Sequence, residues 1–276
     1  MLKKIDLAQQ FLMQHLGLFC CPICQESMVV KGYALVCSKV HQFDLAKKGT
    51  IHFLQRQIKS NYTKQLFTSR RQMIMSGMYQ PLITAINQQL TGDVLLDVGC
   101  GEGSFLASLD FSDVRCGFDI AKEGIALASD YTDSSTFFCV ADLTHLPFGN
   151  QSISTVLNLF TPSNYQEFQR ILKPNGRIIK VVPEADYLKE LRAAYQQRVD
   201  YSNNSVLDKF HANFHLELSE RISYQFAIPK DLRQLPLEMS PLEWQVSKAL
   251  KQKVRQAPPH ALTIDVRLLV GSLKTP

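Results

Sequence analysis

The stretch VLLDVGCGEGSFL, residues 94–106, decides the fold of this chain. The segment from Val94 to Val98 is almost wholly apolar, which is typical of a strand buried on both faces of a parallel sheet. The strand is followed at once by three glycines, Gly99, Gly101 and Gly103. Glycine adopts positive φ and lets a ligand approach the backbone closely. The run therefore predicts a strand-to-helix turn that holds a nucleotide-like cofactor.

Acidic residues around these glycines distinguish between cofactors. Dinucleotide-binding folds use G-x-G-x-x-G and hold a pyrophosphate over a helix N-terminus. Here the run is D-x-G-x-G-x-G, with Asp97 and Glu102 where phosphates would lie. The pocket therefore favours a cation. S-adenosylmethionine carries a sulfonium and an ammonium group and no phosphate, so it matches this pattern.

Further apolar runs repeat the strand pattern along the chain. VRCGFDI ends at Asp119, at the spacing of an acid that accepts hydrogen bonds from ribose hydroxyls. STFFCVADLTHLPF places Asp142 and Leu143 after the next strand, and ISTVLNLF and LKPNGRIIKVVP supply two more strands. This series resembles the class I S-adenosylmethionine-dependent methyltransferases. It predicts an α/β fold with a Rossmann-like sheet, whose expected donor contacts include Asp97, Gly99, Gly101, Gly103, Asp119, Asp142 and Leu143.

The C-terminal third is predicted to complete this sheet. Residues 184–199 and 230–255 are predicted to be mainly helical, and residues 219–228 and 261–274 are predicted strands. These last two strands have no glycine-rich turn, so we expect an antiparallel pair at the edge of the sheet.

Two pairs of metal-ligand residues lie near the N-terminus. Cys21 and Cys24 form the first pair, and Cys37 and His41 form the second after twelve intervening residues. Zinc prefers four thiolate or imidazole ligands in a tetrahedron, and two such turns joined by a β-hairpin supply them. The sequence therefore predicts a zinc site at these four residues. Cys20 is the alternative to Cys21, which has the tighter spacing.

The chain is predicted to have three parts. Residues 1–54 form a helix at 4–16 and the zinc-binding module, whose hairpin turns at Gly32. Residues 55–92 form a helical linker, and residues 93–276 form the donor-binding domain. We expect the module and the donor-binding domain to have separate cores, because a metal supplies the stability that so small a core lacks.

The linker contains several residues with two interpretations. Arg70 and Arg71 are either solvated helix charges or phosphate contacts, and Tyr79 either lies over the donor or packs beside it. Gly77 predicts a break in the helical pattern. The core candidates are Leu66, Ile74, Leu82 and Ile86.

Positive charge is concentrated at the N-terminus of the chain. The net charge is +5, but residues 1–71 contain eleven Lys and Arg against three acidic residues, which gives +8 there and −3 in the remaining 205 residues. This favours a polyanionic substrate, and the alternative is a solvated lysine-rich surface. No apolar run is long enough to span a membrane and no signal peptide pattern is present. We therefore expect a cytoplasmic protein with reduced or metal-bound cysteines.

Four motifs lie between residues 21 and 103, namely Cys21-Pro22-x-Cys24, Cys37-x3-His41-Gln42-Phe43-Asp44, Tyr79-Gln80-Pro81-Leu82 and Asp97-x-Gly99-Cys100-Gly101-Glu102-Gly103. With these motifs the chain resembles one family over nearly its whole length, the 23S ribosomal RNA guanine-N1 methyltransferases. The resemblance implies methylation of guanine N1 in hairpin 35 of 23S rRNA, near the macrolide site, by a homodimer that binds S-adenosylmethionine and Zn²⁺. The family has two subfamilies that modify neighbouring guanines.

Carried over by position, the resemblance implies donor contacts at Tyr79, Gly103 and Ser104, besides the four zinc ligands. Tyr187 stands where members of the family often have a histidine near the cofactor, so that role is not transferred to it. Guanine N1 carries a proton near neutral pH, so the base must be unpaired and N1 must lose this proton. Asn158, Thr161 and Tyr187 are candidate wall residues, and the sequence identifies no catalytic base.

Two other functions fit the same motifs. One is a methyltransferase acting on a small molecule, with the zinc module as a structural lid. The other is a binding protein that retains the pocket but only grips RNA.

Overall fold

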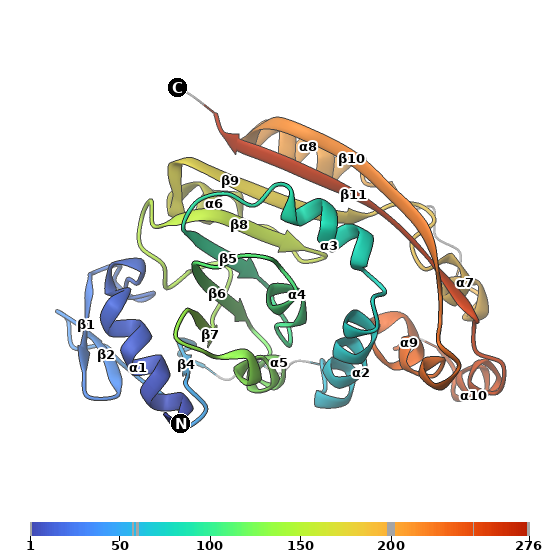
Figure 1. Cartoon of the computed structure of the whole chain (residues 1–276), viewed down its shortest axis with the longest axis horizontal. Helices are drawn as coiled ribbons and strands as arrows, with labels where there is room; N and C mark the ends of the chain where they lie inside the picture. Colours follow the sequence, from blue (N-terminus) through green and yellow to red (C-terminus); the bar gives the residue numbers. More distant parts are fainter. Residues whose placement is uncertain (1, 57, 59–60, 198–201, 245, 275–276) are drawn as a thin grey trace.

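The computed structural model describes residues 2–56, 58, 61–197, 202–244 and 246–274, and its strands form two sheets (Figure 1). The strands are β1 (Met28–Lys31), β2 (Ala34–Cys37), β3 (Gln42–Asp44), β4 (Thr50–His52), β5 (Val94–Val98), β6 (Val114–Asp119), β7 (Thr136–Val140), β8 (Ile153–Leu159), β9 (Leu172–Pro183), β10 (Phe214–Ala227) and β11 (Ala261–Leu273). The α-helices are α1 (Lys4–Gln14), α2 (Lys64–Met75), α3 (Gln80–Asn87), α4 (Ser104–Ala107), α5 (Lys122–Ala128), α6 (Tyr165–Ile171), α7 (Lys189–Ala194), α8 (Asn204–Asn213), α9 (Leu235–Glu238) and α10 (Lys248–Gln256). Short 3₁₀ turns are η1 (Leu16–Leu18), η2 (Ser129–Tyr131), η3 (Lys230–Leu232) and η4 (Pro241–Glu243).

The larger sheet has eight strands in the order β10-β11-β9-β8-β5-β6-β7-β4. The six strands from β9 to β4 run parallel to one another. β11 is antiparallel to both β9 and β10. Successive residues of β5 alternate between two cores, with Leu96 and Val98 in one and Leu95 in the other. This alternation arises because neighbouring side chains of a strand point to opposite faces. The arrangement confirms the predicted α/β class I methyltransferase fold with an antiparallel edge pair.

The smaller sheet belongs to the zinc module. β1, β2 and β3 are antiparallel, and the β1–β2 hairpin turns at Gly32, whose φ is 59°. Figure 1 shows this module, with α1 beside it, at the β4 edge of the large sheet. β4 itself pairs in parallel with β7, with Ile51 opposite Cys139. The N-terminal part of the chain thus supplies a strand of the catalytic sheet.

The expectation of separate cores is wrong. Phe11 of α1 stacks on Phe137 of β7 with ring centroids 5.4 Å apart, and Phe19 lies 5.6 Å from Phe148. All four rings belong to one buried cluster that also contains central strands of the large sheet. The large aromatic residues before the zinc ligands bury their surface against β7 and the loop after it, because the small module offers no comparable apolar volume. The division of the chain at residues 54 and 92 stays a prediction.

The linker and the C-terminal region follow most of their predicted pattern. Gly77, with φ 89°, separates α2 from α3, and the four core candidates of the linker are buried. The helix predicted at 184–199 is wrong at both ends, since α7 covers only Lys189–Ala194, between the positive φ of Leu188 (53°) and that of Gln196 (54°). The Glu190 carboxylate accepts hydrogen bonds from the backbone and side chain of Thr263, which fixes α7 against β11. Predicted elements extend over residues 57, 59–60, 198–199 and 245, which lie outside the described residues.

No helix within the described ranges is long and apolar enough to cross a membrane.

Candidate zinc and methyl-donor sites

The structure brings the four predicted zinc ligands together. Their ligand atoms all lie within 4.8 Å of one another. Cys24 Sγ is 3.7 Å from Cys37 Sγ, and His41 Nδ1 is 3.5 Å from Cys21 Sγ and 3.4 Å from Cys37 Sγ. Zinc–ligand bonds of about 2.0–2.3 Å in a tetrahedron place the ligand atoms roughly 3.5–3.8 Å apart. The four side chains therefore fit a zinc ion with little rearrangement.

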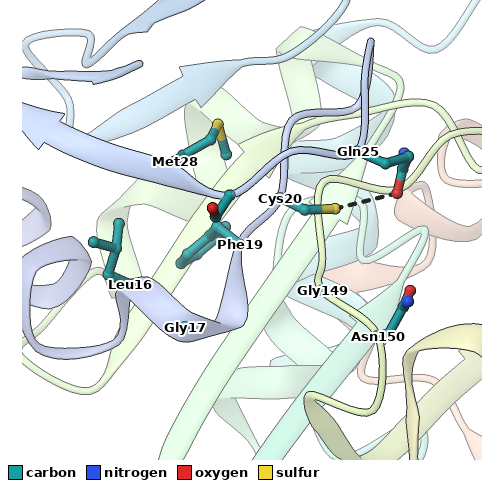
Figure 2. A pocket seen from close by; sticks show the side chains of 9 residues that line it. Leu16, Gly17, Phe19, Cys20, Gln25, Met28, Gly149 and Asn150 are labelled. Atoms are coloured by element: carbon teal, nitrogen blue, oxygen red, sulfur yellow. Dashed lines mark hydrogen bonds between the residues drawn. The ribbon is translucent and has the colours of Figure 1, made fainter. Parts of the chain in front are cut away.

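Cys20 points away from this cluster. It lines a cavity of about 440 Å³ between the module and the Gly149–Asn150 turn. Figure 2 shows the Cys20 thiol directed at the side chain of Gln25, whose Oε1 is 3.4 Å away. The thiol also donates to the Phe148 carbonyl at 3.1 Å, and burial raises its pKa. Cys20 therefore packs the junction between module and sheet, and Cys21 takes the position at the metal cluster.

The glycine run forms a loop at the carboxyl end of β5. Gly99, Gly101 and Gly103 have φ values of 70°, 56° and 78°, all in the left-handed region that glycine adopts at no steric cost. The Gly101 N–H donates to one oxygen of Asp119 at 2.9 Å, and the Ala121 N–H donates to the other at 2.7 Å. Asp119 thus braces the glycine loop. Each of its oxygens keeps a second lone pair that a ribose hydroxyl can use.

Three carboxyl groups surround this loop, and two of them are buried, whereas Asp119 is partly buried. Asp97 is 2% exposed and Glu102 is 1% exposed. Burial raises the pKa of Asp97 to about 8, and the neighbouring charges of Asp119 and Glu102 add to this effect. Burial also raises the pKa of Glu102 and of Asp119, and the positive charge of Arg70 opposes both shifts. Glu102 Oε2 is buried and has no hydrogen-bond partner among the described residues. This cluster of carboxyl groups fits a cationic ligand.

Helix α2 covers the glycine loop. The Phe67 ring lies 3.1 Å from where a Cβ on Gly101 would be, and Arg70 Nη1 lies 3.4 Å from the same point. Arg71 pairs with Asp130 at 3.1 Å and donates to the carbonyls of Leu127 and Glu102 at 2.7 and 3.1 Å. Neither predicted role fits Arg71, because its charge is paired and two of its bonds hold α2 on α5 and the loop. Arg70 lies against Gly101 of the glycine loop.

The other predicted donor contacts line the same edge of the sheet. Asp142 and Leu143 follow β7, and Asp142 accepts a hydrogen bond from the Thr144 N–H at 2.8 Å. Ser104 begins α4 and is fully buried. Tyr79 is also buried, and its hydroxyl lies 2.6 Å from that of Tyr187. The glycine loop, Asp119 and Asp142 therefore follow three adjacent parallel strands, β5, β6 and β7.

A buried polar network lies beyond β8. The Lys180 ammonium donates to Asn158 Oδ1 at 2.5 Å and to Ser163 Oγ at 2.9 Å, and burial lowers its pKa to about 8. The Asn158 amide donates to Thr161 Oγ1 and to the Pro162 carbonyl at 2.6 and 2.9 Å. Two of the three candidate wall residues are thereby fixed in place. Their polar atoms form hydrogen bonds that hold the loop after β8, and this loop lies against Gly99.

Comparison with known proteins agrees with both sites. A zinc-ribbon model described as "RlmA, N-terminal" matches residues 19–61, and a methyltransferase domain model matches residues 96–180. The Bacillus subtilis (strain 168) protein YxjB, provisionally named a 23S rRNA (guanine-N1)-methyltransferase, is 34% identical over 274 residues, which cover 92% of this chain and 97% of YxjB. The chain belongs to the 23S rRNA (guanine-N1)-methyltransferase family.

Two further comparisons place this family member. The 23S rRNA (guanine(748)-N1)-methyltransferase of Streptomyces fradiae is 27% identical to this chain. The match covers 91% of this chain and 95% of the S. fradiae protein. A solved complex of the Haloferax volcanii Trm112 methyltransferase activator with a methyltransferase matches 78% of this chain and 99% of that chain. Its TM-score is 0.51 at 21% identity, which shows a shared fold. As a family member the chain is an S-adenosylmethionine-dependent methyltransferase with a zinc ribbon.

Sequence reasoning missed three features of the site. β4 was not expected in the large sheet, although the apolar residues around Ile51 offered a weak strand signal. The sequence contained a signal for the direction of the Arg70 side chain. Arg70 and Arg71 are three and four residues after Phe67, so all three share one face of a helix. No sequence pattern indicated the left-handed backbone of Phe160 at the end of β8, whose φ is 58°.

Proposed function

We propose that this chain transfers a methyl group from S-adenosylmethionine to N1 of a guanine in 23S rRNA. The observation that carries this proposal is the conjunction of two sites in one chain, a Cys₃His zinc cluster and a glycine loop ringed by buried carboxyl groups. The names of the B. subtilis and S. fradiae relatives support the reaction and the RNA. The second name specifies guanine 748. The proposal includes a target in hairpin 35, near the macrolide site.

The donor would lie along the ends of β5, β6 and β7. Asp119 would accept hydrogen bonds from the ribose, and Asp142 and Leu143, one strand further, would contact the adenine. The carboxyl groups of Asp97 and Glu102 would face the cationic end of the donor. Arg70 is the cation placed to hold its carboxylate, because its guanidinium lies against Gly101 on the same loop. Tyr79, Gly99, Gly103 and Ser104 would complete the wall of this pocket.

The chain's own residues act mainly by positioning the acceptor. Guanine N1 must lose its proton as it bonds to the methyl carbon, so it requires an unpaired base and a place for the proton to go. Neither Tyr79 nor Tyr187 acts as the base, since burial raises the pKa of both hydroxyls, that of Tyr187 to about 12. Holding N1 in line with the methyl group supplies a large part of the rate acceleration.

The basic module would supply much of the RNA affinity. Lys39 and Lys47 are exposed, and the Lys48 ammonium reaches the Ala126 carbonyl of α5 at 3.2 Å. The module thus presents positive charge next to the catalytic sheet, where a polyanion that crosses both parts would bind. The proposal also includes a homodimer that acts in the cytoplasm, where its ribosomal substrate would be found.

A comparison of methyl acceptors tests this function. The chain is incubated with labelled S-adenosylmethionine and unmodified 23S rRNA, or with free guanosine, GTP and a pool of small metabolites. We expect label in the RNA alone. Label in a metabolite would favour the small-molecule enzyme, and RNA binding with no transfer of label would favour the non-catalytic relative.

A further inference from the structure

Phe160 directly follows β8 and has a strained backbone conformation. Its φ of 58° lies in the left-handed region, which bulky residues rarely adopt. The Phe160 N–H donates to the Val181 carbonyl at 3.1 Å, which ties the strained residue to β9. Strain of this kind persists where the surroundings hold it and is concentrated at functional sites. The conformation fixes the direction in which the Phe160 ring leaves the sheet.

The Phe160 ring forms a pair with Tyr187. Their centroids are 5.4 Å apart and their planes differ by 19°, so the two rings are stacked. The Tyr187 hydroxyl is anchored at 2.6 Å on the hydroxyl of Tyr79, which also lies beside Phe160 at 5.9 Å. Both rings of the pair are half-buried, and the Tyr187 hydroxyl is hydrogen-bonded to that of the buried Tyr79. The pair therefore exposes ring surface while its polar group is bonded inside the molecule.

The order of the strands places this pair on the acceptor side. The glycine loop, Asp119 and Asp142 follow β5, β6 and β7, so the proposed donor lies over that half of the sheet. β8 and β9 lie on the other side of β5, and Phe160 follows β8 directly. Tyr187 follows β9 by four residues. An acceptor next to the methyl end of the donor would lie beside these two rings.

We propose that Phe160 and Tyr187 form an aromatic platform on which the target guanine stacks while N1 is methylated. This inference rests on the proposed function. A guanine that leaves its duplex loses stacking with its neighbours, which costs a few kcal/mol. Stacking on aromatic side chains restores part of that energy and orients the plane of the base. Tyr79 acts as a positioning residue, because its hydroxyl bond holds the Tyr187 ring.

Leucine substitutions test the platform. Phe160→Leu and Tyr187→Leu keep apolar volume but remove the aromatic face, and we expect each to lower kcat/KM for 23S rRNA by about five- to a hundredfold. Phe160→Tyr should restore most of the activity. Affinity for S-adenosylmethionine, measured by calorimetry, should fall much less than kcat/KM in both leucine variants, because the rings follow β8 and β9 and reach the proposed donor pocket through Tyr79. Phe226→Leu is the matched control, since Phe226 is also half-buried in the same core but lies on the edge strand β10.

The outcomes separate the platform from other roles. Unchanged kcat/KM in both leucine variants contradicts the platform, as does an equal loss in Phe226→Leu. A parallel loss of donor affinity assigns the pair to the donor pocket and also contradicts it. If Phe160→Leu does not fold, the result for Tyr187→Leu decides. Absence of RNA methylation by the unsubstituted chain would contradict the proposed function itself, whereas active variants would contradict the platform alone.

Discussion

Asp97 illustrates how a single buried group links the donor site to pH. Its carboxyl group is 2% exposed, and burial raises its pKa to about 8 from its ordinary value of 3.8. The native chain without donor therefore holds a proton there that the unfolded chain releases. The stability contribution of this group is complete below pH 3.8 and falls as the pH rises to about 8. A cationic ligand reverses this preference, since it favours the charged carboxylate.

The first prediction concerns this proton. We expect S-adenosylmethionine to bind with release of a proton at neutral pH and to bind more tightly as the pH rises from about 6 to 8. Calorimetry in two buffers of different ionisation enthalpy measures the proton release. In Asp97→Asn the pH dependence should be reduced, because the amide does not titrate. Identical binding enthalpies in the two buffers, or weaker binding at higher pH, would show that Asp97 is already ionised in the free chain.

At the scale of elements, the glycine loop and the loop after β8 are fitted to each other. A Cβ on Gly99 would lie 2.5 Å from the Thr161 methyl group, which real Cβ contacts do not show. Thr161 cannot move easily, because its hydroxyl donates to the Val98 carbonyl at 3.0 Å and accepts from Asn158. The donor half and the acceptor half of the site therefore share one contact.

The second prediction compares two glycines. Gly99→Ala should lower stability by about 2–4 kcal/mol, the sum of a left-handed alanine and a steric clash, and should weaken donor binding. Gly77→Ala is the control, because Gly77 also has positive φ, 89°, but has no atom within 4 Å of its Cβ position. It should cost only about 1–2 kcal/mol and leave donor affinity unchanged. Chemical unfolding and calorimetry measure both effects, and equal losses in the two variants would exclude a steric role for Thr161.

Elements with strong local patterns could be predicted from the sequence. The apolar run of β5, its three glycines and the spacing of the cysteines and histidine each have one physical explanation, and the structure agrees with each. What the sequence did not reveal depends on long-range contacts. β4 joins the large sheet through β7, about 90 residues away, and the shared core forms because Phe11 meets Phe137. The helix predicted at 184–199 begins only after Leu188, whose backbone is left-handed, and helix propensity does not predict such a residue.

At the scale of the whole molecule, the zinc module shares its hydrophobic core with the large sheet. The aromatic contacts of Phe11 and Phe19 with β7 and the following loop join the two, and Lys4 adds a surface ion pair with Asp130 at 3.1 Å. Loss of the metal would loosen the segment that carries these aromatic rings. Its effect should therefore extend to the sheet that holds the donor.

The third prediction follows from this coupling. In Cys24→Ser, or after removal of zinc by a chelator, we expect the whole chain to unfold in one transition at a lower temperature, with weaker donor binding. Cys20→Ser is the matched control, because Cys20 lies outside the metal cluster, and it should retain zinc. Scanning calorimetry and elemental analysis follow both properties. A separate early transition, with an unchanged donor-binding domain, would show that the two cores are independent.

The fourth prediction locates the RNA-binding charge. Replacing Lys39, Lys47 and Lys48 together by Gln should lower the salt slope of RNA binding by about two to three units. Each phosphate contact releases counterions on binding, so each contact that is lost lowers the slope by a little under one unit. Lys39 pairs with exposed Glu26 at 3.5 Å and is itself exposed, which leaves its charge accessible. The control removes the same charge from α10, through Gln at Lys248, Lys251 and Lys253, and should have a smaller effect. A larger effect of the α10 variant would place the main RNA contact on the C-terminal region.

The most direct test of the account is the chemical position of the methyl group. Unmodified 23S rRNA is treated with the chain and S-adenosylmethionine, digested to nucleosides and analysed by mass spectrometry, and the modified nucleotide is mapped by arrest of reverse transcription. We expect a single 1-methylguanosine in hairpin 35, formed much more slowly when Asp119→Ala replaces the unsubstituted chain. Methylation of another atom, of another base, or of no RNA at all would contradict it.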